Sequence, residues 1–357
     1  MARVTLREIA QQTDLSTFSV SRALAGKDGV SDETRLLVEQ TAMRLGYSKP
    51  ARAASRGIGL VFHDLDKVNS ELQMQIQAGV QREAQRLKKH VQTVWTHTAT
   101  EIIDLARASA GLLLVGPYDA ATRASIKALG VPAVHLGWVE PLEPVDQVIG
   151  TDRESGEAVA HYLIELGHEC IAFVAGTPGY RGRIERFHGA EAEVARHQHV
   201  TLHQLAFDEI GGFVPALLSL TRTGPAPTAF FCAHDGLALT VVTELLHLGY
   251  RIPDDVSVVG FGDFSAATQI SPALTTVRVE GVEFGRVAVR LLLERLEAKG
   301  EGDHPARRVV ITSRLIERRS CGPYTRSKGN RSTGAADVTQ AARSEERAIV
   351  PTGAEAS

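Results

Sequence analysis

The chain has few cysteines, no long apolar run and little net charge, and each absence limits what it can be. Its three cysteines in 357 residues are widely spaced, odd in number and without a metal-binding spacing, so we expect reduced thiols rather than disulfides. No run approaches eighteen apolar residues, and Met1 is not followed by the basic and apolar regions of a signal peptide. We therefore expect a cytoplasmic protein that neither crosses a membrane nor is exported.

Short motifs of common enzyme classes are also missing. The chain contains no Gly-x-Ser-x-Gly elbow, no Walker phosphate loop, no Gly-x-Gly-x-x-Gly after a strand and no His-Glu-x-x-His. His197, His199 and His203 occur near a charged helix end, where such side chains are usually solvated rather than bound to a metal. We therefore expect no enzymatic activity, no catalytic residue, no cofactor and no metal.

The chain does have clear helix signals in its first 46 residues. Thr5 and Glu8 form a capping box, and Ser16 and Ser31 are placed to cap a second and a third helix. The apolar residues predicted to face inward in the first two helices are Ile9, Leu15, Val20 and Leu24. The apolar stripe predicted for the third helix is Leu37, Val38, Thr41, Ala42 and Leu45. Three short capped helices in this order indicate a helix-turn-helix DNA-binding domain at residues 1–47.

The second of these helices has a polar outer face that suits a DNA major groove. Its outward residues are predicted to be Thr17, Phe18, Ser21 and Arg22. Arg22 can donate two hydrogen bonds to guanine, and Phe18 suits contact with thymine methyl groups, with packing in the domain core as the alternative for Phe18. The hydroxyl groups expected to bind phosphates are those of Thr5, Ser16, Ser19 and Ser31. Residues 1–56 hold nine Lys/Arg against six Asp/Glu, so positive charge gathers here although the whole chain carries −3.

From Ile58 the pattern changes to short apolar strands that alternate with amphipathic helices. The predicted strands are 58–62, 91–95, 111–115, 131–136, 171–175, 201–207, 228–233 and 256–261. The predicted helices lie at 72–87, 159–166, 186–196 and 237–248, with a further one that ends at 220. Nearly continuous apolar strands between helices are typical of parallel sheets covered on both faces. Because the alternation restarts after Asp152, we expect two doubly wound subdomains with a cleft at their strand ends.

Several strings of this sequence resemble the LacI/GalR family of bacterial transcription regulators, and together they cover about residues 1–321. The matching strings are Val4-Thr5-Leu6, Ile9-Ala10, Leu15-Ser16, Val20-Ser21-Arg22-Ala23-Leu24, Val30-Ser31, Thr34-Arg35, Leu45-Gly46-Tyr47, Leu166-Gly167-His168, Pro253 to Phe261 and Pro272 to Val277. The resemblance implies an all-α helix-turn-helix headpiece followed by an α/β sensor of two doubly wound parallel-sheet subdomains, similar to periplasmic binding proteins. It further implies chain crossings between the lobes near Thr151, Val277 and His304.

The same resemblance implies a function. We expect a sequence-specific DNA-binding repressor whose affinity for an inverted-repeat operator is controlled by a small sugar or sugar-like effector. It would act as a homodimer, with a tetramer as a further form. The alternative is a sugar-binding protein of the periplasmic type without a regulatory role. The fifteen residues between Trp95 and Gly111 are fewer than is usual in the family and resemble its galactoside-regulating branch.

The resemblance also implies an effector site. The positions that match the family pattern are Asp152, Arg186 with Gly189 three residues on, His234-Asp235 and Asp263. An Asp and an Arg on opposite walls suit the hydroxyl groups of a sugar, while a salt bridge between the lobes is the alternative for this pair. Phe213 and Trp138 are candidates for stacking on a sugar ring, although core packing is the favoured role of each, and Asp235 is expected to cap a helix rather than to bind ligand. Gly262 and His234 depart from the family pattern, in which polar Asp, Asn or Ser residues are usual.

The segments outside the two folded regions are also informative. Residues 48–57 form a short linker in which Lys49, Arg52 and Arg56 can bind phosphates. The family usually has a longer linker with a hinge helix whose leucine wedges into the minor groove, and no large apolar residue is present here. Asp14 stands where the family usually has glycine, and it tolerates left-handed backbone better than most residues.

Residues 58–322 are then the two-lobed effector-binding and dimerisation domain. Residues 323–357 lack an apolar pattern and are predicted to be a disordered tail.

Overall fold

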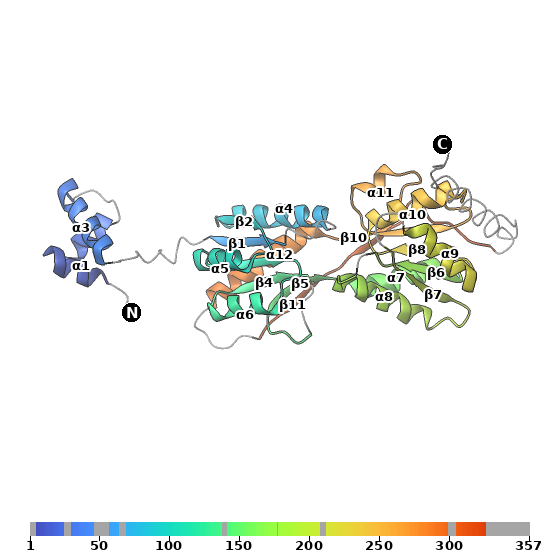
Figure 1. Cartoon of the computed structure of the whole chain (residues 1–357), viewed down its shortest axis with the longest axis horizontal. Helices are drawn as coiled ribbons and strands as arrows, with labels where there is room; N and C mark the ends of the chain where they lie inside the picture. Colours follow the sequence, from blue (N-terminus) through green and yellow to red (C-terminus); the bar gives the residue numbers. More distant parts are fainter. Residues whose placement is uncertain are drawn as a thin grey trace, which may run out of the picture. The chain divides into compact units, whose positions relative to one another are not determined.

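The computed structural model describes residues 5–24, 30–45, 57–63, 69–137, 141–176, 178–207, 212–298 and 305–325 (Figure 1). The chain divides into two compact units, residues 1–56 and residues 57–357. Residues 48–56 of the predicted linker, including Arg52, lie outside the described residues, as do Trp138 and residues 326–357.

The first unit consists of three short helices, α1 (Leu6–Thr13), α2 (Thr17–Leu24) and α3 (Asp32–Leu45). The predicted capping box is present, because Thr5 Oγ1 accepts from Glu8 N and the Glu8 carboxylate accepts from Thr5 N. Ser16 Oγ accepts from Ser19 N at 3.0 Å, and Ser31 Oγ accepts from Thr34 N at 3.2 Å, so both predicted caps are confirmed. Asp14 ends α1 in a left-handed conformation with φ 52°.

A small apolar core joins the three helices. Its buried members are Ile9, Ala10, Val20, Ala23, Val38 and Ala42. Leu15, Leu24 and Leu45 pack at its edge as predicted. Leu37 is exposed, so its place in the predicted stripe of α3 is wrong. The buried positions of α3 are Val38, Thr41 and Ala42, and Leu37 lies next to Val38 in sequence, about 100° around the helix from it.

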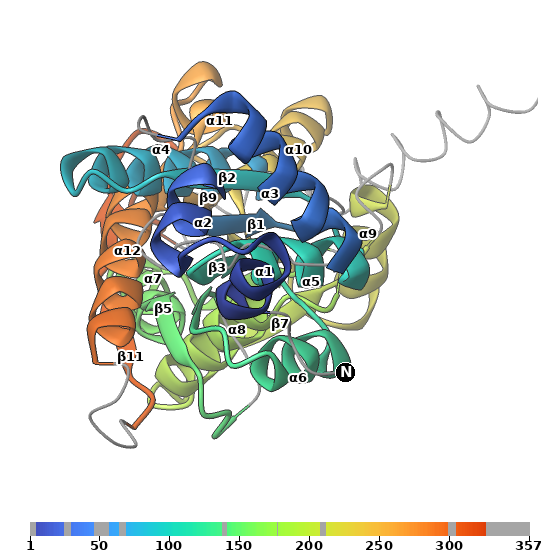
Figure 2. The ribbon, with the colours of Figure 1, turned by 90° about the vertical axis from the view of Figure 1, so that its left-hand side faces the viewer.

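The second unit contains two six-stranded sheets, and we call the sheet that begins with β1 and its helices the first lobe. The strand order of the first lobe is β11 (Arg308–Ile311), β5 (Asp146–Gly150), β4 (Ala133–Leu136), β3 (Gly111–Val115), β1 (Ile58–Phe62) and β2 (Val91–Trp95), all parallel. Helices α4 (Ser70–Arg86) and α12 (Gly281–Glu297) cover one face, and α5 (Ala99–Ala108) and α6 (Ala120–Ala128) cover the other (Figure 2).

The second lobe repeats this architecture. Its strand order is β12 (Arg314–Ile316), β10 (Thr275–Arg278), β9 (Ser257–Gly262), β8 (Ala229–Cys232), β6 (Cys170–Val174) and β7 (Thr201–Leu205). The neighbours are parallel except for β12, which runs antiparallel to β10. Helices α7 (Asp152–Glu165) and α8 (Arg181–Val194) pack together, and α9 (Phe213–Thr223) packs with α10 (Asp235–His247). The short α11 (Ser265–Gln269) follows β9.

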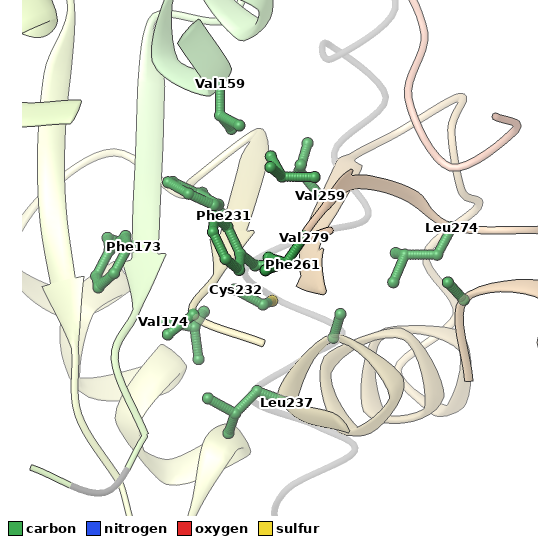
Figure 3. Packing of buried hydrophobic residues seen from close by; sticks show 14 of the residues in the cluster. Val159, Phe173, Val174, Phe231, Cys232, Leu237, Val259, Phe261, Leu274 and Val279 are labelled. Carbon is green, nitrogen blue, oxygen red and sulfur yellow. The ribbon is translucent and has the colours of Figure 1, made fainter. Parts of the chain in front are cut away.

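The core of the second lobe is built from residues that the sequence presents as uninterrupted apolar runs. Every residue of β6, β8 and β9 is buried. The rings of Phe173 and Phe231 pack edge to face, with 5.2 Å between their centres (Figure 3). Strands buried on both faces leave no solvent-facing positions, which is why these segments lack polar alternation.

The chain passes three times between the lobes. It crosses between β5 and α7, then between β10 and α12, and finally between β11 and β12. The predicted crossings near Thr151 and Val277 are confirmed. The third prediction, near His304, is wrong, because β11 still belongs to the first lobe and the chain crosses between Ile311 and Arg314.

Two other expectations need correction. Helices α7 and α8 begin earlier than the predicted 159 and 186, because their first turns are polar and carry no apolar period. The predicted disordered tail is wrong for its first residues: Tyr324 N donates to Leu166 O at 2.7 Å, and the Tyr324 ring stacks on His168.

Candidate functional site

The exposed face of α2 carries the residues predicted to read DNA. Thr17 and Ser21 are exposed, and Phe18 is 69% exposed, so the alternative of a core role for Phe18 is wrong. Arg22 lies one helical turn from Phe18, and its guanidinium carbon is 5.6 Å from the centre of the Phe18 ring. Helix α2 thus presents a cation beside an apolar ring, two groups that suit a guanine edge and a thymine methyl.

A cavity of about 420 Å³ lies between the two lobes, at the carboxyl ends of strands from both sheets. First-lobe residues that line it include Asn69, Leu72, Gln73, Tyr118, Asp119, Arg123 and His135. Second-lobe residues that line it include Asp152, Tyr180, Arg181, Arg183, Arg186, His234, Phe261 and Phe264. Its size and mixed polar and aromatic lining are typical of sites for small organic ligands.

The close packing of α7 against α8 brings Asp152 and Arg186 together. A side chain at Gly156 would lie 2.0 Å from Arg186 O, and one at Gly189 would lie 1.9 Å from Arg153 O, so only glycine permits this approach. As a result Arg186 Nε donates to Asp152 Oδ1 at 2.9 Å. The guanidinium carbon of Arg186 also lies 3.5 Å from the centre of the Phe261 ring.

This pairing corrects two expectations. Asp152 and Arg186 belong to adjacent helices of the second lobe, so they do not lie on opposite walls, and their ion pair does not join the lobes. Both nevertheless line the cavity. Burial lowers the pKa of the Arg186 guanidinium, and the neighbouring Asp152 opposes that shift.

His234 lines the cavity and caps α10. Its Nδ1 accepts from Leu237 N at 3.2 Å, which leaves the proton of the neutral ring on Nε2. Burial, together with the charges of Arg183 and Arg186, lowers the pKa of His234 to about 3. The ring is therefore neutral at physiological pH and can donate one hydrogen bond.

Asp235 was expected to cap a helix, and the structure gives that cap to His234 instead. Asp235 is fully buried, with Oδ2 accepting from Phe264 N at 2.7 Å and Oδ1 accepting from Thr276 Oγ1 at 2.6 Å. Burial raises the pKa of this carboxyl to about 6. Asp235 therefore fixes the loop after β9, which carries the cavity residue Phe264.

Two predicted effector contacts do not line the cavity. Phe213 is 1% exposed and packs edge to face against Phe207 and Phe230, so core packing is its role. Asp263 is held by Arg278 at 2.6 Å and by Arg318 at 2.6 Å. Its φ of 56° turns the chain after β9 toward these arginines.

Several cavity residues were missed from the sequence alone. They are Asn69 just before α4, Gln73 on α4, Tyr118 and Asp119 after β3, and Tyr180 and Arg183 at the start of α8. Tyr118 and Asp119 follow a buried strand. Because the carboxyl ends of parallel strands face the cleft, this position could have indicated that they line the cavity. Asn69 and Gln73 precede or interrupt an apolar helix face, and nothing in that local pattern distinguishes them from solvated residues.

A helix-turn-helix unit joined to a two-lobed unit with a central cavity defines a DNA-binding protein that responds to a small ligand. Sequence comparison agrees with each unit separately. Residues 5–49 match the model of bacterial regulatory proteins of the lacI family, and residues 160–321 match the periplasmic binding protein-like domain. The chain therefore combines a lacI-family helix-turn-helix domain with a periplasmic binding protein-like domain.

Relatives share both regions. The ribose operon repressor of Haemophilus influenzae is 28% identical over 83% of this chain and 93% of its own length. The transcriptional regulator MalR of Streptomyces coelicolor is 29% identical over 91% of this chain and 98% of its own length. These relatives are named as regulators of transcription.

Solved structures agree in fold. The regulator CelR in complex with cellobiose has a TM-score of 0.66 and 27% identity, over 89% of this chain and all of that one. The Lac repressor dimer bound to operator has a TM-score of 0.63 and 24% identity, over 90% of this chain and all of that one. Within the described residues, no helix is long and apolar enough to cross a membrane, and no cluster of His, Cys, Asp and Glu is arranged to hold a metal ion.

Proposed function

We propose that this protein is a sequence-specific repressor whose affinity for an inverted-repeat operator is controlled by a small sugar or sugar-like effector. The observation that carries the proposal is the presence, in one chain, of an exposed recognition face on α2 and a cavity at the strand ends of two lobes. One headpiece can read only a half-site, so two copies are needed for an inverted repeat.

Three of the four arginines that line the cavity form ion pairs with carboxylates, which favours an uncharged ligand. Arg186 is paired with Asp152 at 2.9 Å, Arg123 with Glu143 at 2.7 Å, and Arg181 with Glu185 at 2.7 Å. Because these guanidinium groups already have carboxylate partners, an anionic ligand would gain little from them. Carboxylates and guanidinium groups with remaining hydrogen-bonding capacity suit the hydroxyl groups of a sugar. The faces of Tyr118 and Phe264 can cover its apolar surface.

An exposed apolar face on α10 favours a homodimer. Leu239 and Leu246 are 38% and 44% exposed and lie seven residues apart, on one side of the helix. A second copy of this chain, related by a two-fold axis, would cover the same face on both molecules. A tetramer would need a further surface, and a solution mass would reveal it.

Two measurements test the proposal together. Selection of bound sequences from a random duplex library should recover an inverted repeat. A thermal-shift screen of neutral sugars, sugar acids and sugar phosphates should find a neutral sugar that raises the melting temperature and changes operator affinity. A sugar that stabilises the protein while no repeat is recovered would favour a sugar-binding protein without a regulatory role.

A further inference from the structure

A carboxylate of the first lobe reaches across to the second lobe beside the cavity. Glu71, in the first turn of α4, accepts from Ser265 N through Oε2 at 2.9 Å and from Ser265 Oγ through Oε1 at 2.6 Å. The two residues are 194 positions apart in sequence. They lie on α4 and α11, where the two lobes face each other (Figure 1). The contact therefore joins the lobes at a place other than the three chain crossings.

Ser265 is held next to a second carboxylate that belongs to its own lobe. The amide of Phe264 donates to Asp235, and the next amide, that of Ser265, donates to Glu71. Asp235 is fully buried and also bound by Thr276, so its position is fixed within the second lobe. Glu71 is only half-buried and belongs to the other lobe, so its hydrogen bonds depend on how close the two lobes are.

Both sides of this contact carry cavity residues. Leu72 and Gln73 follow Glu71 on α4, and Phe264 precedes Ser265. Glu71 does not itself line the cavity. The distance between these two walls of the cavity is therefore coupled to the hydrogen bonds between Glu71 and Ser265.

We propose that Glu71 is a positioning residue of the cavity: by binding the start of α11, it holds the two lobes in the closed arrangement and sets the separation of the walls that Leu72, Gln73 and Phe264 form. The proposal rests on the proposed function only where it calls the cavity an effector site. Two hydrogen bonds to a half-buried carboxylate are modest in strength. We therefore expect their loss to raise the population of opened molecules about five- to tenfold.

Hydrogen exchange of the full-length protein, without DNA or sugar, tests the proposal, because exchange rates follow local opening. In Glu71→Ala, peptides from three places should exchange about five- to tenfold faster. These places are the start of α11 (262–270), the start of α4 (69–76) and the first turn of α8 (178–184), of which the last two form opposite cavity walls. Glu71→Gln keeps one acceptor oxygen and should restore part of the protection.

Glu101→Ala is the matched control, since Glu101 is an exposed residue in the first turn of α5 in the same lobe. It should leave all three peptides unchanged. Faster exchange confined to 262–270 in Glu71→Ala would reduce Glu71 to a local helix cap, and unchanged exchange would show that the contact does not hold the lobes together. Either result would overturn the proposal. Since no operator or sugar is present, neither result bears on the proposed function.

Discussion

Arg22 and Phe18 are the residues on which DNA specificity should depend most. Arg22→Ala should cost about 1–3 kcal/mol of operator binding and relax preference at one base pair. Phe18→Ala should abolish any discrimination between thymine and uracil at the contacted position, because the two bases differ only in the methyl group. Fluorescence anisotropy on operator, uracil-substituted operator and random duplexes measures both effects.

Leu36→Ala is the control for these two variants, since Leu36 is an exposed apolar side chain of the same unit but belongs to α3. It should not change base preference. If Arg22→Ala weakened binding to operator and to random DNA equally, Arg22 would be a phosphate contact rather than a reader of guanine.

The pair of Asp152 and Arg186 should determine the response to the effector. Asp152→Ala or Arg186→Ala should weaken binding of the sugar found in the screen by about a hundredfold or more, while operator binding persists. Isothermal titration with that sugar gives the affinity. Each change also leaves a buried charge without its partner, so the melting temperature of the unliganded protein must be measured alongside. Arg107→Ala is the control, because Arg107 is exposed, pairs with Asp104 and does not line the cavity. A normal response in both Asp152 and Arg186 variants would contradict their assignment as effector contacts.

For single residues, the sequence indicated several members of the cavity wall correctly, but it did not indicate how their side chains are arranged. Asp152, Arg186 and His234 do line it. The direct pairing of Asp152 with Arg186 depends on the contact of α7 with α8 at Gly156 and Gly189, and pairing between helices leaves no periodic signal. Phe213 was misplaced because an aromatic residue at a helix start looks the same in sequence whether it faces a core or a cavity.

At the scale of elements, strands with continuous apolar runs were predictable because both of their faces are buried. Strand β5 (Asp146–Gly150) and helices α5 and α6 were not predicted. β5 contains Asp146 and Gln147, which are buried by bonds to Arg295, Arg307 and Arg308 from distant segments. When the hydrogen-bond partner of a buried polar residue lies far along the chain, the local sequence around that residue looks like that of a surface residue.

His168 links the starts of two strands, and its contribution to stability should depend on pH. It is buried between Thr228, at 3.0 Å from Nδ1, and Ser257, at 2.9 Å from Nε2, and it joins the starts of β8 and β9. Burial lowers its pKa to about 4. The unfolded chain takes up this proton near pH 6.5 and the folded chain only near pH 4, so stability is lost as pH falls between these values. By pH 5 the loss from this group should be about 2 kcal/mol.

Urea unfolding at pH 7.5 and pH 5 measures this loss. His168→Gln keeps hydrogen-bonding groups but cannot titrate, so its free energy of unfolding should fall about 2 kcal/mol less than that of the unchanged protein over the same interval. His199→Gln is the control because His199 is exposed. An identical pH dependence in His168→Gln and the unchanged protein would mean that His168 does not contribute.

At the scale of the whole molecule, dimer formation should depend on the exposed face of α10. Leu239→Asp places a charge on that face, where two copies would both have to bury it, so the dimer should dissociate at micromolar concentrations. Light scattering during gel filtration gives the mass. Leu129→Asp, at another exposed apolar position in the first lobe, should remain dimeric. A dimer that survives Leu239→Asp would place the interface elsewhere.

The last prediction concerns how the two units are connected. Residues 48–57 contain three alanines as their only apolar side chains apart from proline, so no bulky apolar side chain is available to wedge between base pairs. Without such a wedge, the unstacking that kinks a duplex has no source within the linker. We therefore expect this protein to bend its operator less than hinge-helix relatives do. Release by the effector should then come from a change in headpiece spacing through a short tether. A circular-permutation gel assay on the bound operator measures the bend, with Ala53→Leu as the matched variant that restores a bulky side chain. A sharp central kink produced by the unchanged protein would contradict the prediction.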